Sequence, residues 1–330
     1  MDLLDLPGYR IIAIDEHKDA FHIQVELHAP PFCCLHCSGS SLYRHEVKLQ
    51  RFQDHAIRGK PTAHLQDKAI NTPVTILGID EVHLLNKPRC VLTDIEQHTI
   101  LDLLRNRDKA SVKNYLQRLP ASIRNGISCV CMDMWQPYKL AIADLLPHAT
   151  IVVDRFHVVK IANTCLDTVR KQLRASLSDA ERRGLMHDRF ILLRRRSDLT
   201  ESQILILETW IGNFPTLHAA YWLKEDFCNL WTAASRESAT LHYQAWQKRL
   251  PAELEAAFHP LTTAMENWQQ EILAYFDHRY TNGPTEALNG LVKLAQRMGR
   301  GYSFEAIRAK VLLTNGLRAP HHTATSMRGN

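Results

Sequence analysis

Two short apolar runs that each end in an aspartate constrain the fold of this chain more than any other feature. Residues 128–132 and 149–153 are uncharged and mostly β-branched or sulfur-bearing, and Asp133 and Asp154 follow them directly. This pattern is typical of strands that are buried on both faces of a parallel sheet. Apolar residues at helical spacing over 137–146 predict a helix between them, in a right-handed strand–helix–strand unit. Ligands gather at the carboxyl ends of such strands, where both acids are expected.

The segment before this unit predicts the rest of the sheet. The run VTILGIDEV (74–82) predicts a strand that ends at Asp80, and the runs CVLTDI and HTILDLL predict two more strands joined by a short polar turn. Residues 110–119 predict an amphipathic helix. The resulting order, βββαβαβ, is that of the ribonuclease H-like α/β fold. The first and fourth strands of that fold pair, so we expect Asp80 and Asp133 to lie side by side.

From Val158 to about Phe276 the strand signals stop and the periodicity becomes helical, which predicts an all-helical insertion. We interpret four tryptophans of this segment mainly as core residues of a helical bundle; they are Trp210, Trp222, Trp231 and Trp246. Residues 155–200 hold 11 Lys or Arg against 5 Asp or Glu. Such an excess is usually a solvated face, but the run Arg194, Arg195 and Arg196 also suits a surface that contacts DNA phosphates.

A late helix carries a third acid on a partly basic face. The triplet Asn282-Gly283-Pro284 predicts the helix start, with Asn282 as the capping residue and the proline in the first turn. One side is apolar and should face the core; it consists of Leu288, Leu291, Val292 and Ala295. A second stripe consists of Glu286, Asn289, Lys293 and Arg297, at i, i+3, i+7 and i+11. This stripe suits a carboxylate that meets a metal, with Lys293 and Arg297 as DNA-binding neighbours that hold a phosphate chain.

Three of the acids, Asp80, Asp133 and Glu286, form a candidate catalytic metal site. Two carboxylates at strand ends and one on a late helix can hold two divalent ions about 4 Å apart, which activate a water or a 3′-hydroxyl for in-line displacement at phosphorus. Oxygen ligands favour magnesium or manganese. The remaining acids in this part of the sequence are interpreted as structural; they are Glu81, Asp94 and Asp102.

The motif Asp154-Arg155-Phe156-His157 leaves two alternatives open. Asp154 is either a fourth acid of the site or the cap of a helix that starts near His157. The spacing alone favours a core or capping role for His157 over a functional one.

The N-terminal segment predicts a β-hairpin over residues 9–28, followed by a possible zinc half-site. Cys34 and Cys37 form a C-x-x-C pair, which is half of a tetrahedral zinc site. No second pair follows at a recognisable spacing, so we expect no tightly bound structural zinc. Residues 67–73 are polar and predict a linker.

Composition narrows the class of protein. The eight cysteines show no disulfide-framework spacing, which suits a reduced, cytoplasmic protein. No apolar run approaches the roughly 18 residues that a transmembrane helix needs, so we expect no membrane partner. The formal net charge of +5 permits an acidic partner such as DNA without requiring one.

Five sequence motifs lie along the predicted core. They are GIDE (78–81), MDMWQPY (132–138), P-x-A-x-I-V-V-D-R-F-H-V (147–158), T-N-G-x-x-E-x-L-N-x-x-x-K (281–293) and R-x-x-x-G-Y (297–302). As a set they resemble the ISL-three family of bacterial insertion-sequence transposases, in the DDE superfamily. The resemblance implies a ribonuclease H-like core interrupted by the helical insertion, with Asp80, Asp133 and Glu286 as the metal-binding triad. It also implies that His157 contacts the scissile DNA.

The same resemblance predicts the activity, the domains and the setting. It implies a magnesium-dependent DNA transposase with two ions per active site, acting on DNA as a homo-oligomer in the bacterial cytoplasm, associated with the nucleoid. The predicted domains are a zinc-finger-like remnant (1–66), the linker (67–73), the first part of the core (74–157), the helical insertion (158–276) and the core completion (277–330).

Two departures from the family pattern keep alternatives open. Family members usually carry a second zinc knuckle and a helix-turn-helix region, neither of which the sequence shows, and Ala287 replaces a common glycine. The alternatives are a truncated DNA-binding regulator and a ribonuclease H-like nuclease without transposition.

Overall fold

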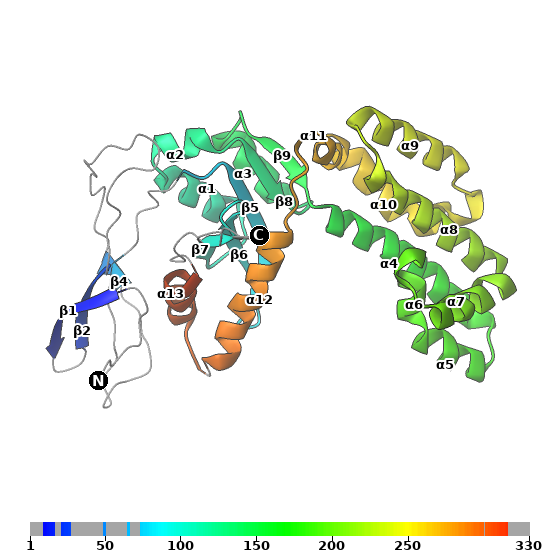
Figure 1. Cartoon of the computed structure of the whole chain (residues 1–330), viewed down its shortest axis with the longest axis horizontal. Coiled ribbons are helices and arrows are strands. Elements are labelled where there is room, and N and C mark those ends of the chain that lie inside the picture. Colours follow the sequence, from blue (N-terminus) through cyan, green and yellow to red (C-terminus); the bar gives the residue numbers. More distant parts are fainter. Residues whose placement is uncertain are drawn as a thin grey trace, which may run out of the picture. The chain divides into compact units, whose positions relative to one another are not determined.

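The structure is a computed structural model that describes residues 73–299 and 301–315, together with four strands at 9–16, 21–27, 49–50 and 65–66. The chain divides into two compact units, Met1–Thr150 with Asn282–Asn330, and Ile151–Thr281 (Figure 1). The first unit contains a five-stranded sheet with helices packed on it, and the second consists almost entirely of helices.

A mixed sheet forms the centre of the first unit. Its strands are β5 (Ile76–Leu84), β6 (Lys87–Asp94), β7 (Thr99–Leu104), β8 (Cys129–Met132) and β9 (Thr150–Val153). They lie in the order β7-β6-β5-β8-β9, with β5 antiparallel to β6 and parallel to β8. The predicted pairing of the first and fourth strands is therefore confirmed. This order is compatible with a ribonuclease H-like DDE core.

The first of these strands is longer than predicted. We expected it to end at Asp80, but β5 continues for four more residues to Leu84. The cause is its antiparallel partner β6, which pairs with β5 along its whole length up to a two-residue turn at Leu85 and Asn86. Both turn residues have positive φ, at 53° and 59°, as a tight hairpin requires. Asp80 consequently lies inside a paired strand.

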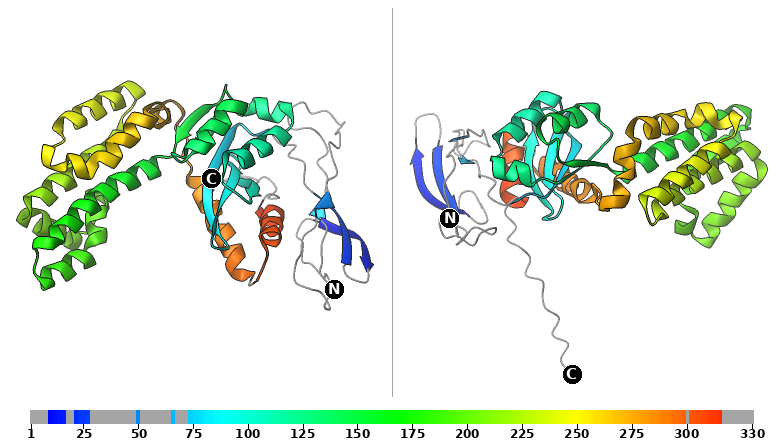
Figure 2. Two further views of the ribbon diagram at one scale, coloured as in Figure 1. Left: turned by 180° about the vertical axis from the view of Figure 1, so that it is seen from behind. Right: turned by 90° about the horizontal axis from the view of Figure 1, so that it is seen from above.

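Helices cover both faces of the sheet (Figure 2). On one face, β5, β6 and β7 share a buried apolar cluster with α12 (Gly283–Met298) and α13 (Phe304–Asn315). The strand residues Val82 and Leu84 point into this cluster, so Asp80, at the same alternating positions, shares their face. The other face is covered by α1 (Lys109–Arg118) and α3 (Gln136–Leu145), with the short α2 (Ala121–Gly126), which was not predicted, before β8.

The late helix begins where expected but is held differently. It starts at Gly283, with proline in its first turn. Asn282 makes no side-chain cap; it is fully buried and its Nδ2 donates to the carbonyl oxygen of Ile79, 3.2 Å away. Leu288 and Val292 face the core as predicted, whereas Leu291 is 36% exposed, so its predicted core position is wrong. The helix meets the sheet along a narrower apolar stripe than the sequence indicated.

The second unit is built from α-helices with short 3₁₀ turns. Its helices are α4 (Arg155–Leu173), α5 (Asp179–His187), α6 (Arg189–Leu193), α7 (Glu201–Asn213), α8 (Pro215–Asn229), α9 (Arg236–Arg249), α10 (Ala252–Leu273) and α11 (Tyr275–His278). The long α4 packs against α8 and α10. Trp246 is fully buried as predicted, but Trp222 is 41% exposed, so its interpretation as a core residue is wrong. Its ring is left at the surface of α8.

Near the N-terminus, β1 (Tyr9–Glu16) and β2 (Phe21–Leu27) pair as the predicted antiparallel hairpin. The two-residue strands β3 (Leu49–Gln50) and β4 (Leu65–Gln66) also pair. Cys34 and Cys37 lie outside the described residues. In the part of the chain that is described, every helix is too short or too polar to cross a bilayer.

Candidate functional site

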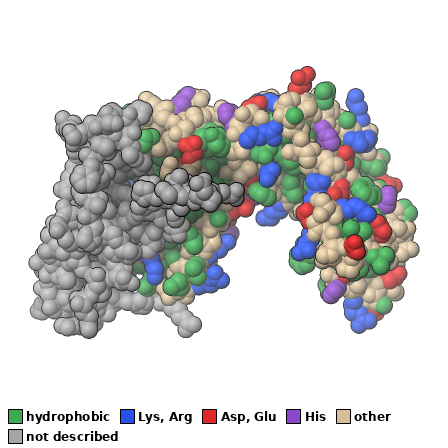
Figure 3. Space-filling view, in the orientation of Figure 1, with side chains coloured by type: hydrophobic (Ala, Val, Ile, Leu, Met, Phe, Trp, Pro, Cys, Tyr) green, Lys and Arg blue, Asp and Glu red, His purple; other side chains and the backbone are tan. Residues whose placement is uncertain are grey.

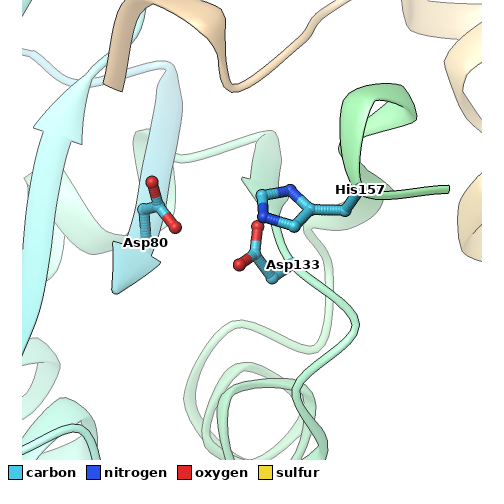
Figure 4. Close-up of side chains that lie close together, drawn as sticks. All are labelled: Asp80, Asp133 and His157. Carbon is cyan, nitrogen blue, oxygen red and sulfur yellow. The ribbon is translucent and has the colours of Figure 1, made fainter. Parts of the chain in front are cut away.

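Two aspartates converge where β8 ends beside its longer neighbour β5. The parallel register of β5 and β8 sets Ile79 opposite Met132, so the residues that follow, Asp80 and Asp133, come next to each other. One carboxylate oxygen of Asp80 lies within 4.8 Å of one of Asp133. Figure 4 shows the two side chains, Asp80 on β5 and Asp133 just beyond β8. Asp80 is buried at 5% exposure and Asp133 is half-buried, so the pair lies at the rim of the core.

Two hydrogen bonds fix the orientation of the Asp80 carboxylate. Its Oδ1 accepts from the backbone N–H of Glu81 at 2.7 Å, and its Oδ2 accepts from Nδ2 of Asn289 at 2.7 Å. Asn289 lies on α12, is 6% exposed, and also donates to the carbonyl oxygen of Glu81 at 3.4 Å. The late helix thus reaches one of the two aspartates directly, through an amide. Sequence reasoning placed Asn289 on the stripe but gave it no role of its own.

Close contacts hold α12 against this part of the sheet. The hydroxyls of Thr93 and Thr285 are 2.6 Å apart in the buried interface. A Cβ at Gly78 would come within 3.0 Å of both hydroxyl oxygens, so glycine is needed for this approach. Farther along the helix, Oε1 of Gln296 accepts from the backbone N–H of Leu85 at 2.9 Å. The two ends of α12 are therefore both tied to β5 or its neighbour.

Glu286 lies in the first turn of α12 and is exposed. Among the described residues, no cluster brings its carboxylate within 4.8 Å of both Asp80 and Asp133. It does lie one turn before Asn289, and residues three apart on a helix are neighbours. The acid is therefore carried by the part of α12 that meets Asp80. Its role as the third site acid stays a prediction.

The acids interpreted as structural have local partners. Glu81 pairs with Arg107, Asp94 accepts from the backbone N–H groups of Glu96 and Gln97, and Asp102 binds Arg308 at 2.6 Å. Behind the sheet, burial raises the pKa of the Cys90 thiol to about 12. That thiol therefore stays protonated at neutral pH and adds no charge beside the carboxylates.

In the second unit, Asp154 caps a helix. Its carboxylate accepts from the backbone N–H of Phe156 at 3.4 Å at the start of α4. It is fully buried and also lies 3.3 Å from Nδ1 of His157. The capping alternative for Asp154 is therefore confirmed, and a further function of Asp154 or His157 stays a prediction.

Most of the arginine run in the second unit is engaged with other side chains. Arg195 binds Glu225 at 3.1 Å and Asn229 at 2.6 Å, and Arg196 binds Glu208 at 2.6 Å. Arg194 is exposed and pairs with no carboxylate among the described residues. On the face of this unit seen in Figure 3, Lys and Arg side chains are interspersed with Asp and Glu. On α12, Lys293 and Arg297 are exposed.

The groups around Asp80 and Asp133 fit a hard divalent cation. Both carboxylates offer oxygen ligands, and Oδ1 of Asn289 is buried with no hydrogen-bond partner among the described residues. Oxygen donors of this kind suit magnesium or manganese, which bind through one or two carboxylates and keep other positions for water and phosphate. The cysteines of the described sheet are buried on β6 and β8 and add no ligand of that type.

Comparison with known proteins identifies the family of the chain. A family model described as "Transposase", of the DDE ISL-three group, matches residues 77–311. The chain is 26% identical over 234 residues to the transposase for insertion sequence element IS1001 of Bordetella parapertussis. The aligned region covers 69% of this chain and 58% of that protein. The chain is also 26% identical over 267 residues to the transposase for insertion sequence element IS1557 of Mycobacterium tuberculosis, covering 72% and 59%. The chain thus matches less than two thirds of the length of these relatives. It belongs to the ISL-three family of DDE transposases.

Proposed function

We propose that this chain is a DDE transposase that cleaves DNA strands and joins them to a new site, using magnesium or manganese. The observation that carries the proposal is the pair of carboxylates within 4.8 Å of each other, Asp80 inside β5 and Asp133 directly after the parallel strand β8. Support comes from the family match over 77–311, which includes both acids and Glu286. In this proposal the core is ribonuclease H-like, and α12 and α13 complete it. The helical segment between β9 and α12 is an insertion.

The described residues divide the work of such a site. Asp80 and Asp133 would hold the divalent ions, with Glu286 as the third acid. When bound, two such ions supply an activated water or 3′-hydroxyl and stabilise the leaving oxygen at phosphorus. Asn289 and the backbone N–H of Glu81 hold the Asp80 carboxylate in one orientation, which preorganises it for a cation. Ordering the ligands in advance lowers the entropy lost when the ion binds.

Basic side chains would hold the DNA. Lys293 and Arg297 extend along the exposed face of the helix that carries Glu286, and Arg194 is exposed on the second unit. Contacts of this kind supply salt-dependent affinity without reading sequence. His157 remains a candidate for DNA contact from the family motif, whereas Arg195 and Arg196 are already engaged with side chains of their own unit. In this proposal DNA is the substrate, and the chain acts on it as a homo-oligomer in the bacterial cytoplasm.

The proposal is tested with purified protein and a supercoiled plasmid that carries the gene with its flanking DNA. We expect strand cleavage and strand transfer in magnesium, abolished by Asp133→Asn without a change in thermal unfolding. The matched control is Asp144→Asn, because Asp144 is an exposed acid on α3 that pairs with two surface lysines, Lys109 and Lys113. Cutting by the Asp133→Asn variant would show that this acid is structural.

The products separate the proposal from its alternatives. Cleavage without any joined product would identify a nuclease without transposition. Binding of DNA with neither cleavage nor joining, in protein whose thermal unfolding is cooperative, would identify a regulator.

A further inference from the structure

The indole of Trp135 is exposed near the aspartate pair, and no role in the local structure explains this exposure. Trp135 is 37% exposed and lies two positions after Asp133. Its backbone N–H donates to the carbonyl oxygen of Asp133 at 2.7 Å, which ties it to the end of β8 in a tight turn. It occupies the N-cap position of α3 but makes no side-chain cap. Because an indole offers only an N–H donor, it cannot satisfy the free N–H groups at a helix start.

A guanidinium group lies over this ring. The Arg107 guanidinium carbon is 4.3 Å from the ring centroid of Trp135, within the range of a cation–π contact. Arg107 also forms an ion pair with Glu81, whose other carboxylate oxygen lies 3.1 Å from Nδ1 of His83. The guanidinium is thereby held between a carboxylate and the ring. The indole is a plane with one cationic side; the ring lies two positions after Asp133, and the carboxylate that pairs with the arginine belongs to Glu81, which follows Asp80 directly.

The chemistry of this plane suits a nucleobase. Bases stack on aromatic rings and on arginine whatever their identity, because each has a π-face. In a paired duplex both faces of a base are covered by its neighbours, so only an unpaired or extruded base can use the ring. A base stacked here would hold its own backbone phosphates near the two carboxylates. Because Arg107 and Glu81 balance each other's charge, stacking on the ring is what would hold the base.

We infer that Trp135, backed by Arg107, stacks against an unpaired base of the DNA strand beside the phosphate that is cleaved. This inference rests on the proposed function and adds to it a substrate feature, a locally opened duplex. The stacked base would fix the position of the strand without requiring a particular sequence. Base stacking would thus explain why the ring of Trp135, two positions after Asp133, is exposed to solvent.

The first test compares binding of two DNA molecules of the same sequence, one fully paired and one with a forked, unpaired end. All variants carry Asp133→Asn, so that the DNA stays intact, and fluorescence anisotropy gives both affinities. We expect the parent to prefer the fork by about tenfold, from the energy of stacking one base. Trp135→Phe should retain most of the preference and Trp135→Leu should lose it.

A matched control is Trp222→Leu. Trp222 is also an exposed tryptophan beneath an arginine, with Arg196 5.9 Å from its ring, but it lies in the second unit on α8. It should leave the ratio of fork to duplex affinity unchanged. A fork preference that is absent from the parent, or that survives Trp135→Leu, would overturn the inference.

A second test locates the base directly. Forked DNA with 5-iododeoxyuridine in the unpaired arm should crosslink to the peptide that contains Trp135 when irradiated, and fully paired DNA should not. A crosslink that maps only elsewhere contradicts the inference. The plasmid assay keeps the two levels apart: wild-type protein that cleaves and joins DNA but shows no fork preference and no crosslink at Trp135 retains the proposed function and loses this inference.

Discussion

The side-chain amide of Asn289 donates a 2.7 Å hydrogen bond to Oδ2 of Asp80, across 209 positions of sequence. This bond joins α12 to β5 at the carboxylate that we assign to the metal site. The amide oxygen of Asn289, by contrast, is buried without a hydrogen-bond partner among the described residues. Leaving a buried acceptor unsatisfied costs about 1–3 kcal/mol, and a bound ligand would recover that cost. Asn289 is therefore a positioning residue with an oxygen available to the site.

Replacing Asn289 by alanine should weaken metal binding. The Asp80 carboxylate would lose the donor that fixes its orientation, and removing such a partner typically lowers metal affinity or activity by about 10–100-fold. Titration calorimetry with manganese on the intact chain measures the affinity independently of catalysis. Gln296→Ala is the control, since Gln296 lies on the same helix and also binds the backbone of the β5 hairpin. Equal manganese affinities for the two variants would remove Asn289 from the site.

The aspartate pair could be predicted because strand geometry is regular. Alternation along β5 and β8 and their parallel pairing decide which residues meet, and both can be read from runs of apolar residues. The partnership of Asn289 with Asp80 could not be predicted in the same way. A helical stripe gives the angular position of a residue but not the depth at which the helix packs on a sheet. The same uncertainty explains why Leu291 was assigned to the core and proved to be exposed.

Gly78→Ala should lower stability and disturb the site together. A methyl group at Gly78 would overlap the hydroxyls of Thr93 and Thr285, which are buried between β6 and α12. Overpacking of this kind typically costs about 1–3 kcal/mol, and here it would push α12 away from Asp80. Thermal unfolding and manganese titration should both report the change. A variant with unchanged unfolding temperature would show that the interface adapts.

Gly290→Ala on the same helix is the matched control. No atom lies within 4 Å of a Cβ added there, so the methyl group meets no obstacle. Alanine is favoured over glycine in a helix by about 1 kcal/mol, so this variant should be slightly more stable. The opposite signs of the two glycine variants test the packing and not the residue type.

Composition alone did not show how the arginine run of the second unit is used. The partner of Arg195, Glu225, is 30 positions away on α8, and Glu225 also binds the buried Lys224 at 2.6 Å. Such pairings depend on which helices become neighbours, and helical periodicity does not specify that. The exposure of Trp222 went unpredicted for the same reason. Counts of charge predicted the basic character of this segment but not which side chains are available.

Acid should destabilise the second unit through Asp167. Burial alone would raise the pKa of Asp167, but Lys171, Arg170 and Arg189 around it outweigh that effect and hold the pKa below its usual range. A carboxyl group with a lowered folded-state pKa stabilises the fold at pH values above its unfolded pKa. That stabilisation is lost as the pH falls through the folded pKa, so the loss should begin below about pH 4.

Urea unfolding followed by tryptophan fluorescence measures this effect. Five of the chain's six tryptophans lie in the second unit, and the sixth is Trp135. Asp167→Asn should lower the free energy of unfolding at pH 7 by about 3 kcal/mol, since it leaves the buried Arg170 without its carboxylate. It should also flatten the decline of the free energy of unfolding below about pH 4. Asp179→Asn, at an exposed acid with a weak contact to Arg182, should change neither. Parallel pH profiles for Asp167→Asn and wild type would refute this account.

The arginine run should divide between DNA binding and structure. Arg194→Ala removes an exposed charge, so it should weaken binding about equally for all duplexes and shallow the dependence of log affinity on log salt by roughly one unit. Lys293→Ala on α12 should do the same. Arg195→Ala should instead lower the free energy of unfolding by about 2 kcal/mol, because Glu225 and Asn229 lose a charged hydrogen-bond partner. DNA binding by this variant should keep a salt dependence close to that of wild type, because the Arg195 guanidinium is engaged within the protein.

Binding isotherms at several salt concentrations, with urea unfolding of each variant, measure both quantities. An unchanged slope for Arg194→Ala, or a slope reduced by one unit for a fully stable Arg195→Ala, would show that the DNA follows a different surface of the second unit.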